Sequence, residues 1–184
     1  DKSVLLSVSN LKKTKGIDLN LQALASLVKK YPHLQYTIIG DGEERESLEN
    51  LVDNLGLRDH VTFKGKLPHG EVLKEMAKCQ IFCLPSWQEG FGVVYIEAMA
   101  QGVPVIGVKG EGIEDVIEHG VNGLLVSPQS VEEIVEAIDS LLGSPDYAKE
   151  LAQRGKDTVY REFTWQNNAW KTLSLYKDLV RGSQ

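Results

Sequence analysis

The sequence predicts an α/β domain in which helices cover both faces of a doubly wound parallel sheet of about six strands. Two observations predict this class: short apolar runs rich in β-branched residues alternate with helical patterns, and glycine-containing turns follow several of these runs. In such sheets the crossovers are right-handed, and ligands bind beyond the carboxyl ends of the strands, near the switch in strand order. The predicted strands are Val4 to Val8, Tyr36 to Ile39, Val61 to Phe63, Ile81 to Leu84, Val103 to Ile106 and Leu124 to Val126.

Glycine-rich turns follow four of these strands and should gather at the ligand-binding edge. They are Gly40-Asp41-Gly42, Gly65-Lys66, the segment Glu89 to Gly92, and Gly110-Glu111-Gly112.

The pattern changes after the sixth strand, where only helices are expected. Their ranges are Val131 to Leu142, Asp146 to Phe163, and a last helix at about residues 165–181. Trp165, Trp170 and Tyr176 make the last helix more apolar than a surface helix needs to be, so it packs either on something outside the chain or back on its own sheet. We expect residues 1–184 to form a single domain.

The composition is that of an ordinary globular domain, with 42% hydrophobic and 25% charged residues among 184. A net charge of −6 argues against a broad nucleic-acid or anionic-membrane surface, because such surfaces need clustered Lys and Arg. An anionic ligand must therefore be held locally. The sequence has no long apolar run and no leader-like start, and it predicts a cytoplasmic protein.

Metal chemistry has no support in the sequence. Cys79 and Cys83 lack the second pair that a zinc site needs, and we interpret them as core thiols. The four histidines stand singly, without a metal-binding spacing. We therefore expect no metal site and no cofactor.

The most informative stretch runs from Glu89 to Glu97 and places two carboxylates eight residues apart around a glycine-broken turn. In one continuous helix the two acids would stand about 12 Å apart along the axis and roughly 80° apart around it, too far to share a ligand. Gly90 and Gly92 break that helix and permit close approach of backbone amides, while Val93 to Gln101 forms an apolar-faced helix with an open N-terminus. This combination suits a nucleotide sugar, whose hydroxyls need acceptors and whose diphosphate needs amides and a cation. The alternative is that both acids are ordinary solvated helix-end residues.

Several common motifs are absent. The loop after the first strand has a single glycine, Gly16, where a dinucleotide fingerprint needs three. Gly65 and Gly70 have the P-loop spacing but Glu71 follows, and Ser86 lies outside a nucleophile-elbow pattern. A nicotinamide dehydrogenase, a P-loop enzyme and a serine hydrolase are thereby disfavoured.

From Val4 to Val180 the chain resembles the C-terminal, donor-binding half of a retaining glycosyltransferase with the GT-B fold, of the group 1 or family 4 type. The most specific marker is the E-x7-E motif of Glu89 and Glu97. The resemblance implies a Rossmann-like sheet that forms one half of a GT-B fold. Supporting matches, in chain order, are Lys15-Gly16, Ile39 to Gly42, Val61 to Gly65, Pro85-Ser86, Glu97 to Ile106 and Gly120 to Val126.

The resemblance implies roles for matching residues. Glu89 would hold hydroxyls of the donor sugar and Glu97 those of the ribose. Lys15 would contact the diphosphate and stabilise the negative charge on the leaving nucleotide, so Glu89 and Lys15 are the catalytic candidates. The amides of Gly90, Phe91, Gly92 and Val93 would bind the sugar and phosphates, and the loop with Lys66 and Leu67 would cradle the base.

One position departs from the family pattern. Asn10 stands where members often carry an arginine that contacts the diphosphate, and Lys12 or Lys13 of the same loop could substitute for it. Lysine supplies a point charge where arginine supplies a planar fork.

The resemblance also implies a partner. The donor, a nucleoside diphosphate sugar, would bind here without a metal, because no D-x-D motif occurs, and an N-terminal acceptor domain would be supplied elsewhere. We expect this chain, which starts at Asp1 just before its first strand, to be a fragment or a subunit, with membrane association only through the other half. The alternatives are a nucleotide-binding or scaffolding module without activity, a GT-B epimerase or phosphorylase, and a glycosidase, whose carboxylates would have to face each other across the scissile bond.

Overall fold

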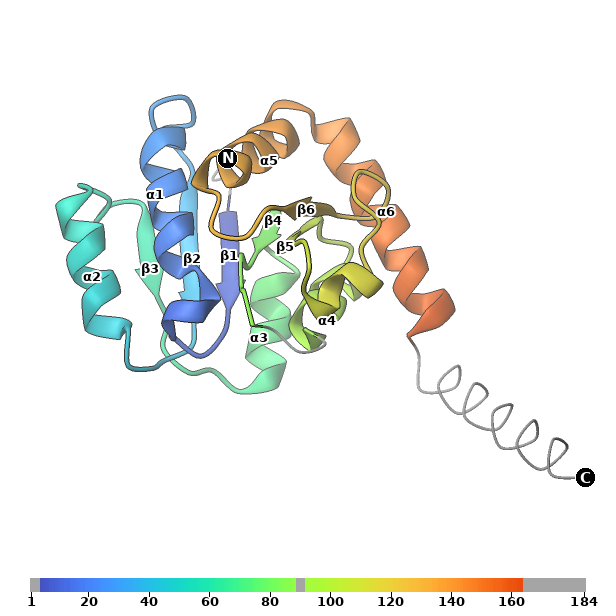
Figure 1. Cartoon of the computed structure of the whole chain (residues 1–184), viewed down its shortest axis with the longest axis horizontal. Helices are drawn as coiled ribbons and strands as arrows, with labels where there is room; N and C mark the ends of the chain where they lie inside the picture. Colours follow the sequence, from blue (N-terminus) through green and yellow to red (C-terminus); the bar gives the residue numbers. More distant parts are fainter. Residues whose placement is uncertain (1–3, 89–91, 164–184) are drawn as a thin grey trace, which may run out of the picture.

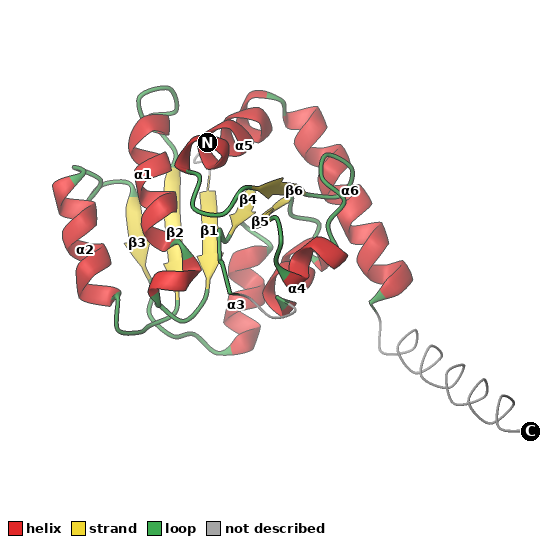
Figure 2. Cartoon of the chain, viewed as in Figure 1, coloured by secondary structure: helices red, strands yellow, loops and turns green. Residues whose placement is uncertain are grey.

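A computed structural model describes residues 4–88 and 92–163 of the chain. The predicted last helix at 165–181 lies outside these residues. The core of the fold is a six-stranded sheet in the order β3-β2-β1-β4-β5-β6, in which every pairing is parallel (Figure 2). The strands are β1 (Val4–Val8), β2 (Gln35–Ile39), β3 (Val61–Phe63), β4 (Ile81–Cys83), β5 (Val105–Val108) and β6 (Leu124–Val126). The predicted doubly wound α/β class is confirmed.

The fifth strand begins two residues later than the sequence predicts. It was expected at Val103 to Ile106 but begins at Val105. The amide of Val103 donates to the carbonyl of Ala98 (3.2 Å) and so closes the preceding helix, and Pro104 has no amide to give. The strand therefore starts at Val105, and Pro104 contributes only its carbonyl, which accepts from the Phe82 amide at 3.0 Å.

Six helices cover the sheet among the described residues, and two short 3₁₀ turns accompany them (Figure 1). On one side α1 packs against α2 and α5, while α3 and α6 pack against α4. The helices are α1 (Ile17–Leu27), α2 (Arg45–Asn54), α3 (His69–Met76), α4 (Val93–Ala100), α5 (Val131–Gly143) and α6 (Pro145–Glu162), with η1 (Lys13–Lys15) and η2 (Gly112–Asp115).

A buried polar network joins the centre of the sheet to α1. Asn20 donates from Nδ2 to the hydroxyls of Ser7 and Tyr36 and to the carbonyl of Cys83, each at 3.1 Å. The Ser7 hydroxyl donates to the same carbonyl, so the Tyr36 hydroxyl, 2.7 Å from Ser7 Oγ, is the donor of that pair. Burial raises the pKa of Tyr36, which keeps its proton in place. One network thus ties together β1, β2, β4 and α1.

Both cysteines are buried and free, as the interpretation as core thiols requires. Burial raises the pKa of Cys79 to about 12 and raises that of Cys83 as well. Neither thiol is therefore poised as a nucleophile near neutral pH.

Removal of the buried hydroxyl tests the network. We expect Tyr36→Phe to lower the free energy of unfolding by about 1–2 kcal/mol, because Ser7 and Asn20 each lose a buried partner. The control is Tyr160→Phe on α6, whose side chain is exposed and which should change stability by less than about 0.5 kcal/mol. Urea unfolding followed by circular dichroism measures both, and equal stabilities for the two variants would refute a structural role for the network.

Candidate functional site

The strand order places a crevice between β1 and β4. The chain runs outward from β1 through β2 to β3, then returns to the other side of β1 and continues through β4 to β6. The loops that follow β1 and β4 therefore leave the sheet in opposite directions, and ligands of doubly wound folds bind at this point. Both loops lead into helices: α1 begins after Gly16 and α4 begins after Gly92. Two helix N-termini thus lie at this edge of the sheet, and each is a favourable place for an anion (Figure 1).

Direct backbone packing holds these two loops together. A Cβ atom at Gly16 would lie 2.4 Å from the carbonyl oxygen of Pro85, so no larger residue fits. The amide of Trp87 also donates to the carbonyl of Thr14 at 2.9 Å. The turn that carries Lys15 is therefore fixed against the loop that leads to Glu89.

The glycines after β2 serve packing as well. A Cβ at Gly40 would lie 1.7 Å from the carbonyl oxygen of Ser9, and one at Gly42 would lie 2.4 Å from that of Leu11. The Gly40 amide also donates to the Gly65 carbonyl at 2.8 Å. The loops after β1, β2 and β3 thus form one continuous backbone edge.

Lys15 ends η1 in a half-buried position beside Gly16, in accordance with its predicted place at the helix start. Asn10 and Lys12 are exposed in the same loop. Lys13 pairs with Asp18 at 2.6 Å, and the hydrogen bond to this carboxylate raises the pKa of the lysine. Of the two lysines considered as substitutes for the missing arginine, Lys13 is therefore already engaged with an acid.

The start of α4 has the geometry expected from the sequence. Gly92 caps the helix with φ of 69° and ψ of 49°, a left-handed conformation that favours glycine. Val93 is exposed at the first helical position, and Glu97 lies on the helix one turn further on. Glu89, Gly90 and Phe91 lie outside the described residues, so the placement of Glu89 stays a prediction.

Lys66 is exposed and Leu67 is half-buried in the loop after β3, where the resemblance puts the base. Gly65 has φ of 64°, and a Cβ built on it would meet no group within 4 Å apart from its chain neighbours.

No sequence pattern indicated two of the polar contacts at this edge. His69 Nε2 lies 2.8 Å from Oε1 of Glu97. Oε1 of Glu111 accepts from the amide of Gln88 at 2.9 Å, immediately before the segment from Glu89 to Gly92. Only the position of His69 directly after the Gly65 loop could have drawn attention to it.

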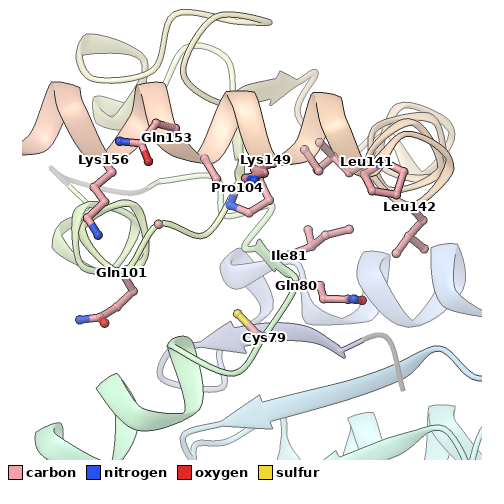
Figure 3. Close-up of a pocket in the computed structure, with 14 residues that line it drawn as sticks. Cys79, Gln80, Ile81, Gln101, Pro104, Leu141, Leu142, Lys149, Gln153 and Lys156 are labelled. Atoms are coloured by element: carbon pink, nitrogen blue, oxygen red, sulfur yellow. The ribbon is translucent and has the colours of Figure 1, made fainter. Parts of the chain in front are cut away.

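A pocket of about 610 Å³ lies elsewhere, at the amino ends of β4 and β5 (Figure 3). Ile81, Pro104, Gln101 and Lys156 are among the residues that line it. A Cβ at Gly102 would lie 3.6 Å from Cδ of Lys156, so the stem of this side chain passes beside the C-terminal end of α4. None of the predicted site residues that the structure describes lines this pocket.

Among residues 4–88 and 92–163, no three His, Cys, Asp or Glu side chains come close enough together to hold a metal ion. No helix within the same ranges has the length and apolar character to cross a membrane.

Residues 1–158 match the model of a protein family described as glycosyl transferases group 1. The chain belongs to this family. An uncharacterized glycosyltransferase of Methanocaldococcus jannaschii is 33% identical over 178 residues, which cover 96% of this chain and 45% of that protein. The chain thus spans less than half the length of this relative.

Solved structures of glycosyltransferases show the same fold. Sucrose-phosphate synthase from Thermosynechococcus elongatus superposes with a TM-score of 0.88 and 31% identity over 99% of this chain and 46% of its own. Anabaena HepE in complex with UDP-glucose has a TM-score of 0.86 and 28% identity, over 95% of this chain and 49% of its own. The C-terminal domain of a group 1 family glycosyl transferase of Francisella tularensis has a TM-score of 0.82 and 27% identity, over 89% of this chain and 88% of its own. This chain therefore corresponds to the C-terminal half of the GT-B fold.

The close approach at Gly16 can be tested against a glycine with the same backbone angle. Gly16 and Gly56 have φ of 66° and 67°, but the space around Gly56 is open. Gly16→Ala should lower the free energy of unfolding by at least about 1 kcal/mol more than Gly56→Ala, because only Gly16 adds a backbone clash to the cost of the positive φ. Chemical unfolding of both variants measures the difference, and an equal loss would show that the two loops do not depend on this contact.

Proposed function

We propose that this chain is the donor-binding half of a retaining glycosyltransferase, which moves a sugar from a nucleoside diphosphate sugar to a glycan, lipid or small-molecule acceptor. The observation that carries the proposal is the start of α4, where Gly92 caps a helix that bears Glu97 one turn later, at the switch point beside β1. An anion-binding helix terminus and a hydroxyl-binding acid on the same helix match the phosphate and the ribose of a nucleotide.

The positive charge near the proposed diphosphate position also supports this function. A helix N-terminus directs its first amides outward, and α1 and α4 both begin at this edge. Lys15 adds a full positive charge just before the start of α1. These groups would stabilise the charge that develops on the nucleoside diphosphate as it leaves the sugar. In this proposal Lys15, rather than a metal ion, supplies the cation. Lys12 is the exposed cation of the loop that could stand in for the arginine absent at Asn10.

The remaining roles follow from the family. Glu89 would hold the sugar hydroxyls, the amides from Gly90 to Val93 would hold the sugar and phosphates, and the loop with Lys66 and Leu67 would cradle the base. The bound UDP-glucose in Anabaena HepE supports a nucleotide sugar as the class of donor.

Transfer also needs an acceptor site. Since the chain spans 45% of its Methanocaldococcus relative and 46% of sucrose-phosphate synthase, we propose that an N-terminal acceptor domain completes the enzyme. The apolar segment at 165–181 would contact that domain, and any association with a membrane would come through it. We propose that the complete protein acts in the cytoplasm.

One observation favours a second candidate function. Asn10 lacks the charge of the arginine common at this position, as would be expected of a module that binds nucleotides without catalysing transfer. Activity of the complete two-domain protein separates the two functions, because a binding module would hold the donor and leave it intact.

Titration of the chain with UDP, GDP, ADP and their sugar conjugates tests donor binding. We expect one nucleotide and its sugar conjugate to raise the melting temperature and to shift amide resonances of the loops after β1 and β4, because these loops would contact the diphosphate. The absence of any response to all six compounds would contradict the proposal.

Glu89 and Glu97 should bind different parts of the donor. Glu97→Gln should weaken the nucleotide and the nucleotide sugar alike, by roughly 10- to 100-fold, because hydrogen bonds to a charged acceptor are lost in both. Glu89→Gln should weaken only the nucleotide sugar. Isothermal titration calorimetry with both ligands measures each factor, and equal losses for the two ligands at Glu89 would refute the division.

A further inference from the structure

His69 lies against the acid that the proposed function assigns to the ribose. Its Nε2 atom is 2.8 Å from Oε1 of Glu97, and 28 residues separate the two in the sequence. The His69 side chain is 68% exposed and that of Glu97 27%, so the pair is at the surface of the site. Exposed pairs of this kind add little to stability. The main consequence of the contact is therefore its effect on the Glu97 side chain.

Packing between α3 and α4 places the two residues together. Pro68 has an extended backbone with ψ of 146°, and α3 begins at His69 directly after it. Val72 and Met76 are the buried residues of α3, and α3 packs against α4. The contact between His69 and Glu97 is thus set by the packing of two helices.

The hydrogen bond leaves Glu97 able to bind a second partner. A carboxylate only accepts, so His69 must be the donor, and it can donate from Nε2 as a neutral or as a protonated imidazole. One N–H on Oε1 occupies one of about four lone-pair positions, which leaves Oε2 for a ribose hydroxyl. A free glutamate would lose side-chain freedom on binding, whereas one already held by His69 has lost part of it beforehand.

The same segment carries the loop assigned to the base. The Gly65 carbonyl accepts from the Gly40 amide at 2.8 Å, and Lys64 pairs with Glu75 of α3 at 2.7 Å. One end of the loop is thereby anchored to the sheet edge, and its other end reaches Glu97 through His69.

We propose that His69 is a positioning residue of the donor site: it holds Glu97 in the conformation that accepts the ribose hydroxyls and couples this acid to the loop after β3. The inference rests on the proposed function of Glu97. Because His69 acts on the nucleoside end, it should affect a nucleotide and its sugar conjugate by the same factor.

The test uses His69→Ala, His69→Gln and the control His33→Ala, which removes an exposed histidine from the turn before β2, at the other end of the strands. Isothermal titration calorimetry of the full chain with UDP, GDP and ADP measures affinity. For the nucleotide that binds, His69→Ala should weaken binding roughly two- to tenfold. His69→Gln should restore most of the loss because its amide can donate to the same oxygen, and His33→Ala should have no effect.

A double variant shows whether His69 acts through Glu97. In the Glu97→Ala background, which leaves no side-chain oxygen for His69 to position, His69→Ala should cause no further loss. Melting temperatures of all variants identify any loss of fold.

Three results would overturn the inference: wild-type affinity in His69→Ala, a loss that adds in full to that of Glu97→Ala, or a folded His69→Gln variant that binds no better than His69→Ala. If the wild-type chain binds none of the three nucleotides, the proposed function itself fails and this inference falls with it. The wild-type titration therefore distinguishes the two failures.

Discussion

The arrangement of the candidate site depends on the buried network of Ser7, Asn20, Tyr36 and the Cys83 carbonyl. This carbonyl ends β4 at the crevice, and Asn20 fixes it to β1 and α1 through hydrogen bonds of 3.1 Å. An unpaired group in this position would incur the full cost of desolvation, so these four groups favour one arrangement of three strands and a helix. That arrangement therefore sets the geometry of the crevice between β1 and β4.

Close backbone packing at glycines extends this fixed arrangement from the core to the loops. Gly16 brings the β1 loop against Pro85, and Gly40 and Gly42 bring the β2 loop against Ser9 and Leu11. Each contact is between backbone and backbone, where a methyl group would already clash. Glycines that resemble ligand-binding residues in the sequence thus have a structural task. Gly16 and Gly92 also share a positive φ, and each caps the helix that follows it. These backbone contacts hold the loops after β1, β2 and β4 close together at this edge of the sheet.

The local charge at the crevice explains how a chain with a net negative charge could bind the anionic ligand that we propose. The net charge of −6 would repel a nucleotide at long range, but salt screens that repulsion beyond about 8–10 Å. At the crevice the first amides of α1 and α4 and the ammonium of Lys15 act within the first turn of each helix. In the proposed function α4 would carry both kinds of recognition, with its N-terminus binding phosphate and Glu97 binding hydroxyls. Its packing against α3 adds His69 to the same site.

The sequence by itself determined the fold class, the position of most strands and the start of α4, because these follow from local patterns: apolar periodicity, turn glycines and an open helix N-terminus. It also indicated the family, through matches spread in order along the chain. It did not reveal that β5 begins after Pro104, since the Val103 amide is taken by the carbonyl of Ala98. Nor did it reveal the network around Asn20, the contact of Glu111 with Gln88, or that of His69 with Glu97. The bond from Val103 is a local one that closes the end of α4. Only the tertiary structure decided the other three, because each joins groups on different segments, and the separation of the partners in the chain carries no information about how those segments pack.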